Sequence, residues 1–358
     1  MMKAFEDNRK RLIGALFTGL SCLTLSALLC GCPSGDSTLP TAPDVSGINA
    51  DLNVLRAEEL FQASSAEDLA SRFAALESEN TISANYLRDY VIQIPPESAD
   101  NPYPYLYETY AEPEMLAWLA DTVADVHADL DQALAKVEQA YRYHRYYLPQ
   151  DSLPSLITYS GVFGSPVLFL PGVAAISLPM FMGRDFSAYK TFPPDYLPRY
   201  FFHRMDKEYL PIEVMDEYAR ARWYCPAVNH KVLDHMIHEG KLLYYLDLVF
   251  PETSDSLKIG YTANQVQWAK ENEVNAWALI LEEELLYNSQ QLQVLRLIGE
   301  GPFTKGMTQE SPGRMGVWLG WQIVREYMRR HPDVSFKELL AMDDAQEILA
   351  ESGWKPNR

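Results

Sequence analysis

Cysteine, basic residues and repeated motifs are all scarce in this 358-residue sequence. Its four cysteines, at positions 22, 30, 32 and 225, are too few for a disulfide scaffold. Lysine and arginine together number 30 against 49 aspartates and glutamates, which gives a formal net charge of −19. Such an acidic surface repels polyanions, so we expect no nucleic-acid partner. The sequence also contains no internal repeat and no phosphate-binding glycine loop, which argues against a repeat architecture and a nucleotide site of that type.

The first 31 residues have the layout of a signal peptide. Lys3 and the basic residues 9–11 precede an apolar run at residues 12–29. The sequence Leu29-Cys30-Gly31-Cys32 resembles the bacterial lipoprotein signal, which implies cleavage before Cys32 and acylation of that cysteine, for example with palmitate. Pro33 stands where an aspartate would retain a lipoprotein at the inner membrane, so the resemblance implies the outer membrane, with the domain facing the periplasm. The apolar run is also long enough to span a bilayer, and an uncleaved signal anchor is the alternative.

The composition divides the remaining chain into a tether and a domain. Residues 32–50 are rich in Pro, Ser, Thr, Gly and Asp, which predicts a flexible tether. Residues 51–358 are expected to form one large domain or two tightly fused lobes, because 47% of the chain is hydrophobic and 12% aromatic. Cleavage leaves a formal charge of about −21 and leaves Cys225 with no second free cysteine, so no internal disulfide is expected.

Apolar residues recur at helical spacing through most of this domain. We expect two or three short helices between residues 52 and 93, with Ser65 as one N-cap, and a long helix over residues 114–147. The tyrosine- and proline-rich stretch from Pro95 to Pro113 is expected to be ordered and non-helical. From Pro193 onward the helical pattern returns.

One stretch has the signature of a β-sheet. Between Leu156 and Met182, three short β-branched or aromatic runs are separated by glycine and proline. Three strands joined by tight turns predict a small antiparallel sheet at about residues 155–182. The predicted fold class is therefore α+β and predominantly helical.

The segment from Asn229 to Phe250 is a helix-length stretch with three of the seven histidines of the chain. His235 and Glu239, four residues apart, lie together on one flank of this helix, and His238 lies slightly further round. This spacing directs two ligands at one zinc ion in the HExxH motif, whose glutamate also acts as general base. Here Leu242 stands at the position of the second histidine, so the motif is incomplete.

A further glutamate completes the set of candidate metal ligands. Glu273 lies in a helical segment, 272–277, that resembles the helix supplying the third ligand in gluzincin peptidases. A site built from His235, His238 or Glu239 with Glu273 requires a nonstandard ligand order, and Glu239 is the candidate general base. In the alternative interpretation, the histidines hydrogen-bond to neighbouring helices, and Glu273 caps a helix or pairs with Lys270. We favour the alternative, since three-ligand catalytic sites seldom survive the loss of a ligand.

The segment from Ser311 to His331 has clear helix boundaries. Ser311 is the expected N-cap and Pro312 the first helical residue. Gly316 and Gly320, one turn apart, predict a groove for another helix, with Trp318 and Trp321 filling the space around it.

A helix is predicted over residues 262–287. Within it, three consecutive glutamates, residues 282–284, interrupt the apolar run from Leu279 to Leu286. One or two of them are expected to face the core and to pair with Arg314 or Arg325 on the later helix.

Several of these segments carry a family resemblance. The nonapeptides that begin at Gly320 (GWQIVREYM) and at Pro332 (PDVSFKELL) resemble the C-terminal signature of the GldB gliding-motility lipoproteins of Bacteroidetes-type bacteria. The octapeptide from Gly240 (GKLLYYLD) and the pair Glu273 and Trp277 are similar to the same family, in the same order. The resemblance covers about residues 52–356 and is most specific in the C-terminal third.

The resemblance implies a lipid-anchored envelope protein associated with the gliding machinery and its coupled secretion system, without established catalytic activity. The family is also distantly similar to zincin peptidases that have lost most metal ligands, which implies a degenerate zincin-like arrangement. His235, His238, Glu239 and Glu273 would then mark a former active-site groove. The residues expected to pack around this groove are Gly240, Trp277, Trp318, Gly320, Trp321 and Arg325.

Together these observations predict a non-catalytic binding or scaffold protein without a cofactor. Its expected partners are the membrane, through the lipid, and an envelope protein or peptide. The rival hypothesis is a zinc-dependent peptidase or peptidoglycan hydrolase with a metal-bound water beside Glu239.

Overall fold

The computed structural model describes residues 41–92, 94–160, 163–224 and 230–357. Helices dominate, as predicted, and a small sheet lies among them. The predicted signal peptide, the lipidation site Cys32 and the lone Cys225 lie outside the described residues. Val45 and Ala50, from the segment interpreted as a tether, are buried.

The sheet has four strands in the order β1-β2-β4-β3 and is mixed, so the prediction of an antiparallel sheet was wrong. The strands are β1 (Val54–Arg56), β2 (Ser155–Tyr159), β3 (Val167–Leu170) and β4 (Val173–Ser177). A tight turn at Gly172, which has a positive φ of 81°, joins β3 and β4 as the expected antiparallel pair. β2, however, pairs with β4 in parallel, and β1 adds a further parallel strand where a helix was expected. Sequence pattern marks buried strands but not their order, and the fully buried β4 is one of the two inner strands, beside β2.

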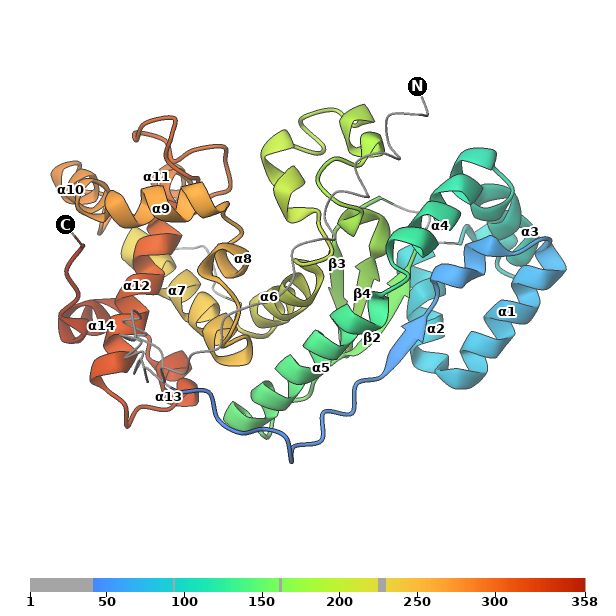
Figure 1. Cartoon of the computed structure of the whole chain (residues 1–358), viewed down its shortest axis with the longest axis horizontal. Coiled ribbons are helices and arrows are strands. Elements are labelled where there is room, and N and C mark those ends of the chain that lie inside the picture. Colours follow the sequence, from blue (N-terminus) through green and yellow to red (C-terminus); the bar gives the residue numbers. More distant parts are fainter. Residues whose placement is uncertain (1–40, 93, 161–162, 225–229, 358) are drawn as a thin grey trace, which may run out of the picture. The chain divides into compact units, whose positions relative to one another are not determined.

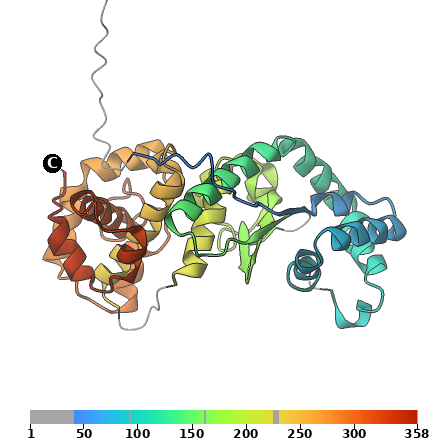
Figure 2. The ribbon, with the colours of Figure 1, turned by 90° about the horizontal axis from the view of Figure 1, so that it is seen from below.

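The two faces of this sheet belong to two hydrophobic cores. Alternate residues of β2 and β4 point to opposite faces. Leu156 and Ile176 pack in the larger core with the C-terminal helices. Ile157 and Ala175 pack in the smaller core with the helices of the first 120 residues. Figure 2 shows these N-terminal helices, coloured blue, beside the green strands.

The helices before the sheet differ from the prediction at two places. They are α1 (Ala66–Glu79), α2 (Thr81–Tyr86), α3 (Tyr103–Leu106), α4 (Glu114–Val126) and α5 (Leu130–Tyr147), with short 3-10 or π segments at residues 58–62, 87–92, 96–98 and 107–111. Ser65 caps α1 as predicted, accepting a hydrogen bond from the backbone N–H of Asp68. Residues 103–111, expected to be non-helical, are helical. The long helix expected over 114–147 is broken between Val126 and Leu130, where buried His127 binds the Leu178 carbonyl across the fold, at 3.1 Å.

The sheet is followed by short 3-10 helices, including η7 (Arg199–Arg204), and then by the remaining α-helices. The latter are α6 (Leu210–Arg222), α7 (Val232–Val249), α8 (Asp255–Ile259), α9 (Ala263–Glu271), α10 (Glu273–Glu282), α11 (Gln291–Ile298), α12 (Met315–Arg330), α13 (Phe336–Ala341) and α14 (Ala345–Ser352). α12 begins three residues later than predicted, because Ser311 bonds within its own loop and Thr304 Oγ1 accepts the hydrogen bond from the Met315 N–H. α6 contacts β3 and β4 as well as α7, so it lies between the sheet and the α7–α12 pair (Figure 1).

Two glycines bring α7 and α12 into backbone contact. A Cβ atom on Gly320 would lie 1.9 Å from the Met236 carbonyl oxygen, and one on Gly240 would lie 2.4 Å from the Gly320 oxygen. Gly316 faces a different helix, since a Cβ there would meet Leu297 and Ile298 of α11. Gly316 and Gly320 were expected to form one groove for a single helix. Instead, Gly320 faces α7 and Gly316 faces α11.

Candidate functional site

The three candidate ligands on α7 face different surroundings. His238 lines a small cavity of about 280 Å³ with Trp223, and burial lowers its pKa to about 4. His235 is partly buried, which lowers its pKa, and its Nε2 has no hydrogen-bond partner among the described residues. Glu239 lines a separate, larger pocket. The helix thus directs His238 and Glu239 into different cavities.

Glu273, the fourth candidate ligand, is held elsewhere. It is 1% exposed and accepts hydrogen bonds of 2.9 Å from the Trp318 indole N–H and from the Asn357 backbone N–H. Burial raises its pKa, against the effect of these two donors. The main contacts of Glu273 are therefore Trp318 and Asn357, and not a helix cap or Lys270. In the part of the chain that the structure describes, no three His, Cys, Asp or Glu side chains lie close enough to hold a metal ion.

The residues expected to pack around the groove lie in the core between α7, α12 and their neighbours. Trp321 donates a hydrogen bond to Asp247, and the Arg325 guanidinium lies 3.6 Å from the centre of the Trp321 ring. Arg325 also pairs with Asp247 at 2.7 Å. Trp277 packs edge-on against Trp354 at the C-terminal end of the chain.

The glutamates at 282–284 do not face the core, so that prediction was wrong. α10 ends at Glu282 and all three side chains are exposed. Glu283 pairs with Arg296 instead of Arg314 or Arg325. The apolar run on which the prediction rested does not continue as a helix through these residues.

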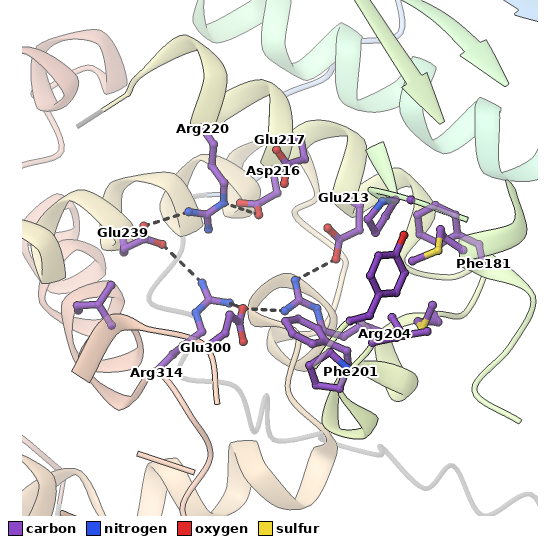
Figure 3. A pocket seen from close by; sticks show the side chains of 18 residues that line it. Phe181, Phe201, Arg204, Glu213, Asp216, Glu217, Arg220, Glu239, Glu300 and Arg314 are labelled. Carbon is purple, nitrogen blue, oxygen red and sulfur yellow. Dashed lines mark hydrogen bonds and ion pairs between the residues drawn. The ribbon is translucent and has the colours of Figure 1, made fainter. Parts of the chain in front are cut away.

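The pocket at Glu239 has a volume of about 470 Å³ (Figure 3). Such a volume falls within the range of about 300–1,000 Å³ that is typical of ligand sites. One wall is charged, and the opposite wall is apolar and aromatic. The apolar wall is built from Pro166, Met180, Phe181, Tyr196, Leu197, Pro198, Phe201, Met205 and Ile298.

Three arginines link four carboxylates across the charged wall (Figure 3). Arg204 binds Glu213 and Glu300 at 3.0 and 2.9 Å. Arg314 binds Glu300 at 2.9 Å and lies 3.5 Å from Glu239. Arg220 binds Glu239 at 3.0 Å and Asp216 at 2.8 Å. Each arginine therefore contacts two carboxylates, and the network runs unbroken from Glu213 to Asp216.

The network explains the state of Glu239. Burial alone would raise the pKa of this carboxyl, but Arg220 and Arg314 outweigh burial and hold the pKa below its ordinary value. Glu239 is therefore an ionised bridge between two guanidinium groups. A carboxylate committed in this way is a poor general base for a hydrolase, because the bound cations stabilise its ionised form.

The helical pattern after Pro193 includes α6, but its part in the site was not predicted, although it supplies half of the charged wall. α6 contributes Glu213, Asp216, Glu217 and Arg220, which are spaced i, i+3, i+4 and i+7 and therefore lie on one face. The other face of α6 is apolar and buried. The signal was present as a charged stripe at helical spacing, which is also typical of a solvated surface.

Glu217 is the exception within this wall. It makes no ion pair or hydrogen bond with any other described residue, although it lies beside Asp216 on the same face. Burial, reinforced by the charges of Asp216 and Glu213, raises the pKa of Glu217 to about 7. A carboxyl with such a pKa changes its charge near neutral pH.

The described part of the chain has no helix long and apolar enough to cross a membrane. Fold and pocket together define a predominantly helical α+β protein with a small mixed sheet and one charged, half-apolar pocket.

A family model described as "Gliding motility protein GldB" matches residues 38–356. The chain therefore belongs to the GldB lipoprotein family. Searches of the curated proteins and of the solved structures give no match.

Proposed function

We propose that this chain is a lipid-anchored protein of the cell envelope whose domain binds a polypeptide partner in the pocket between α6, α7 and η7. The anchor is Cys32, exposed as the first residue when residues 1–31 are removed. Membership of the GldB lipoprotein family supports the anchor. The outer membrane, with the domain in the periplasm, follows from Pro33 at the position after the lipidated cysteine.

The observation that carries the binding role is the pocket itself. It joins an apolar wall to a charged wall whose arginines are fixed by carboxylates, so the polar groups are held in place before a partner arrives. Tyr196 lies at this site with 59% of its surface exposed. Aromatic side chains in this position are frequent anchors of polypeptide interfaces. We place no catalytic step in the pocket.

The anchor is tested by metabolic labelling with palmitate. The wild-type chain should incorporate the label, and the Cys32→Ser variant should not. Equal labelling of the two chains would contradict lipidation at Cys32.

The pocket is tested by site-specific photocrosslinking in cells. A photoreactive phenylalanine analogue replaces Tyr196 in the pocket or Tyr146, which is 50% exposed on α5 and lies outside it. We expect a light-dependent adduct with a polypeptide from position 196 and not from position 146.

A blocked pocket provides the control. Gly164 lines the pocket and a Cβ there would have no atom within 4 Å, so Gly164→Trp can fill the cavity without a backbone clash. Gly47→Trp is the matched variant, because Gly47 also has free space and lies outside the pocket. The adduct should disappear in Gly164→Trp and persist in Gly47→Trp. An adduct that survives in both would exclude the pocket as the binding site.

A further inference from the structure

The arginines of the pocket are not available to bind an anionic ligand. Arg204, Arg220 and Arg314 each donate to, or pair with, two carboxylates within 3.5 Å. An anion would have to displace a carboxylate that is already buried beside its arginine. That exchange leaves the displaced carboxylate without its cation, which is unfavourable in a partly dry site.

Negative charge, in contrast, exceeds positive charge in the wall. Five carboxyl groups face three guanidinium groups there. Glu239 and Glu300 each lie between two arginines. Glu213 and Asp216 each pair with one arginine. Glu217 forms no ion pair with any arginine that the structure describes. The excess is therefore concentrated on the partly buried face of α6 that lines the pocket, within about one helical turn.

Two oxygen atoms in this wall are also unsatisfied. Asp216 Oδ1 and Glu239 Oε2 are buried and accept no hydrogen bond from any described residue, although Glu239 Oε2 lies 3.5 Å from the Arg314 guanidinium. Buried polar atoms without a partner are uncommon in folded proteins, and each needs a donor from water or from a ligand. Both atoms lie in side chains that line the same cavity.

The remaining surface of the cavity is apolar and favours contact with an apolar part of a ligand. Phe181, Phe201 and Leu197 also line the pocket, and the Arg204 guanidinium lies 5.2 Å from the centre of the Phe201 ring. Apolar walls lower the local dielectric, which strengthens the attraction between a carboxylate and an incoming cation. A ligand that satisfies both walls carries a cationic donor at the end of an apolar stem.

We propose that the pocket binds a lysine or arginine side chain of the partner polypeptide, with its cationic end at Glu217 and Asp216 and its stem along Phe181 and Phe201. This inference rests on the proposed function and specifies its ligand. A neighbouring apolar residue of the partner fills the space at Tyr196 and Leu197.

The test is calorimetric titration of the full chain in detergent with three probes at pH 8. The first is an acetylated and amidated tripeptide, Leu-Lys-Phe; the second has norleucine in place of lysine; the third is 1-aminopentane. The lysine peptide should bind about tenfold or more tightly than the norleucine peptide, as expected for one charge-assisted hydrogen bond at a carboxylate.

The Glu217→Gln variant should lose this preference for lysine and bind the two peptides within about twofold. Since Glu217 has no ion pair with a described residue, this substitution breaks none and the fold should be retained. Glu208→Gln is the control, because it removes the same charge from an exposed position before α6 and should keep the preference.

Equal binding of the two peptides, binding of neither, or an unchanged lysine preference in Glu217→Gln would overturn the inference. Binding of 1-aminopentane as tightly as the lysine peptide would assign the site to a free amine and overturn the peptide assignment. These failures differ from failure of the proposed function. If the crosslink at position 196 forms and depends on an open pocket while lysine is not preferred, the pocket binds a partner of other chemistry.

Discussion

The contact between α7 and α12 makes a definite prediction for Gly320→Ala. The added Cβ would lie 1.9 Å from the Met236 carbonyl oxygen and 2.4 Å from its carbon. Real Cβ atoms lie at least 3.0 Å from such atoms, so the helices must separate by about 1 Å or more. No flexible side chain can yield instead, because the obstacle is backbone in the middle of a helix.

The cost follows from what the two helices bury. Trp318, Trp321 and Met236 are at most 1% exposed, and a separation of 1 Å removes close contacts from all three. Overpacking of a core usually costs about 1–3 kcal/mol, and a backbone obstacle places this variant at about 3 kcal/mol or more. For a chain of this size, that loss corresponds to a fall in Tm of about 5–10 °C.

Thermal unfolding followed by circular dichroism measures this effect. Gly47→Ala is the control, since its new Cβ would have no atom within 4 Å. The control should melt within about 1 °C of the wild type, because surface substitutions away from special features have small effects. A Gly320→Ala chain that melts with the control would refute the backbone contact between the two helices.

Three further predictions follow from other contacts. Asp247→Asn should lower the free energy of unfolding by about 3–5 kcal/mol in urea titrations, because it leaves the buried cations of Lys258 and Arg325 without their shared carboxylate. Ser65→Ala should cost about 1 kcal/mol in the same assay through loss of the α1 cap, and an unchanged midpoint would argue against that cap. Because the pKa of Glu217 is raised to about 7, its contribution to stability is present below pH 4.5 and lost as the pH rises through 7. Glu217→Gln should therefore be more stable relative to wild type at pH 8 than at pH 4.5, by up to about 3 kcal/mol, and a pH-independent difference would contradict the raised pKa.

The sequence pattern predicted individual helices and strands better than it predicted how the strands pair and where a long helix breaks. The three strands after Leu156 and the cap at Ser65 are present, because strand runs and N-caps depend on local chemistry. The parallel pairing of β2 with β4 depends on which strand is buried deepest in the finished fold, and no local pattern encodes it. The break between α4 and α5 likewise coincides with a long-range contact, between His127 and the Leu178 carbonyl, that no local pattern encodes.

The sequence indicates the helix that carries Glu239 but not the side chains that meet it in the fold. Glu239 is a candidate because of its spacing from His235, and it lines the pocket between α6, α7 and η7. Its actual partners, Arg220 and Arg314, lie 19 and 75 positions away along the chain, and neither belongs to a known motif. Spacing on one helix identifies which side chains share a face, whereas the charges that meet them come from the tertiary fold.

The α6 wall carries negative charge that the arginines do not neutralise, and the proposed binding of a cationic side chain depends on this charge. Glu217 reports on this charge, and its carboxyl carbon can be titrated by ¹³C NMR in the full chain labelled at glutamate. The predicted midpoint in the free protein is about pH 7, and the lysine tripeptide should lower it, because a bound cation favours the ionised carboxyl. A midpoint near the ordinary value of 4.5 that does not respond to the peptide would contradict the account.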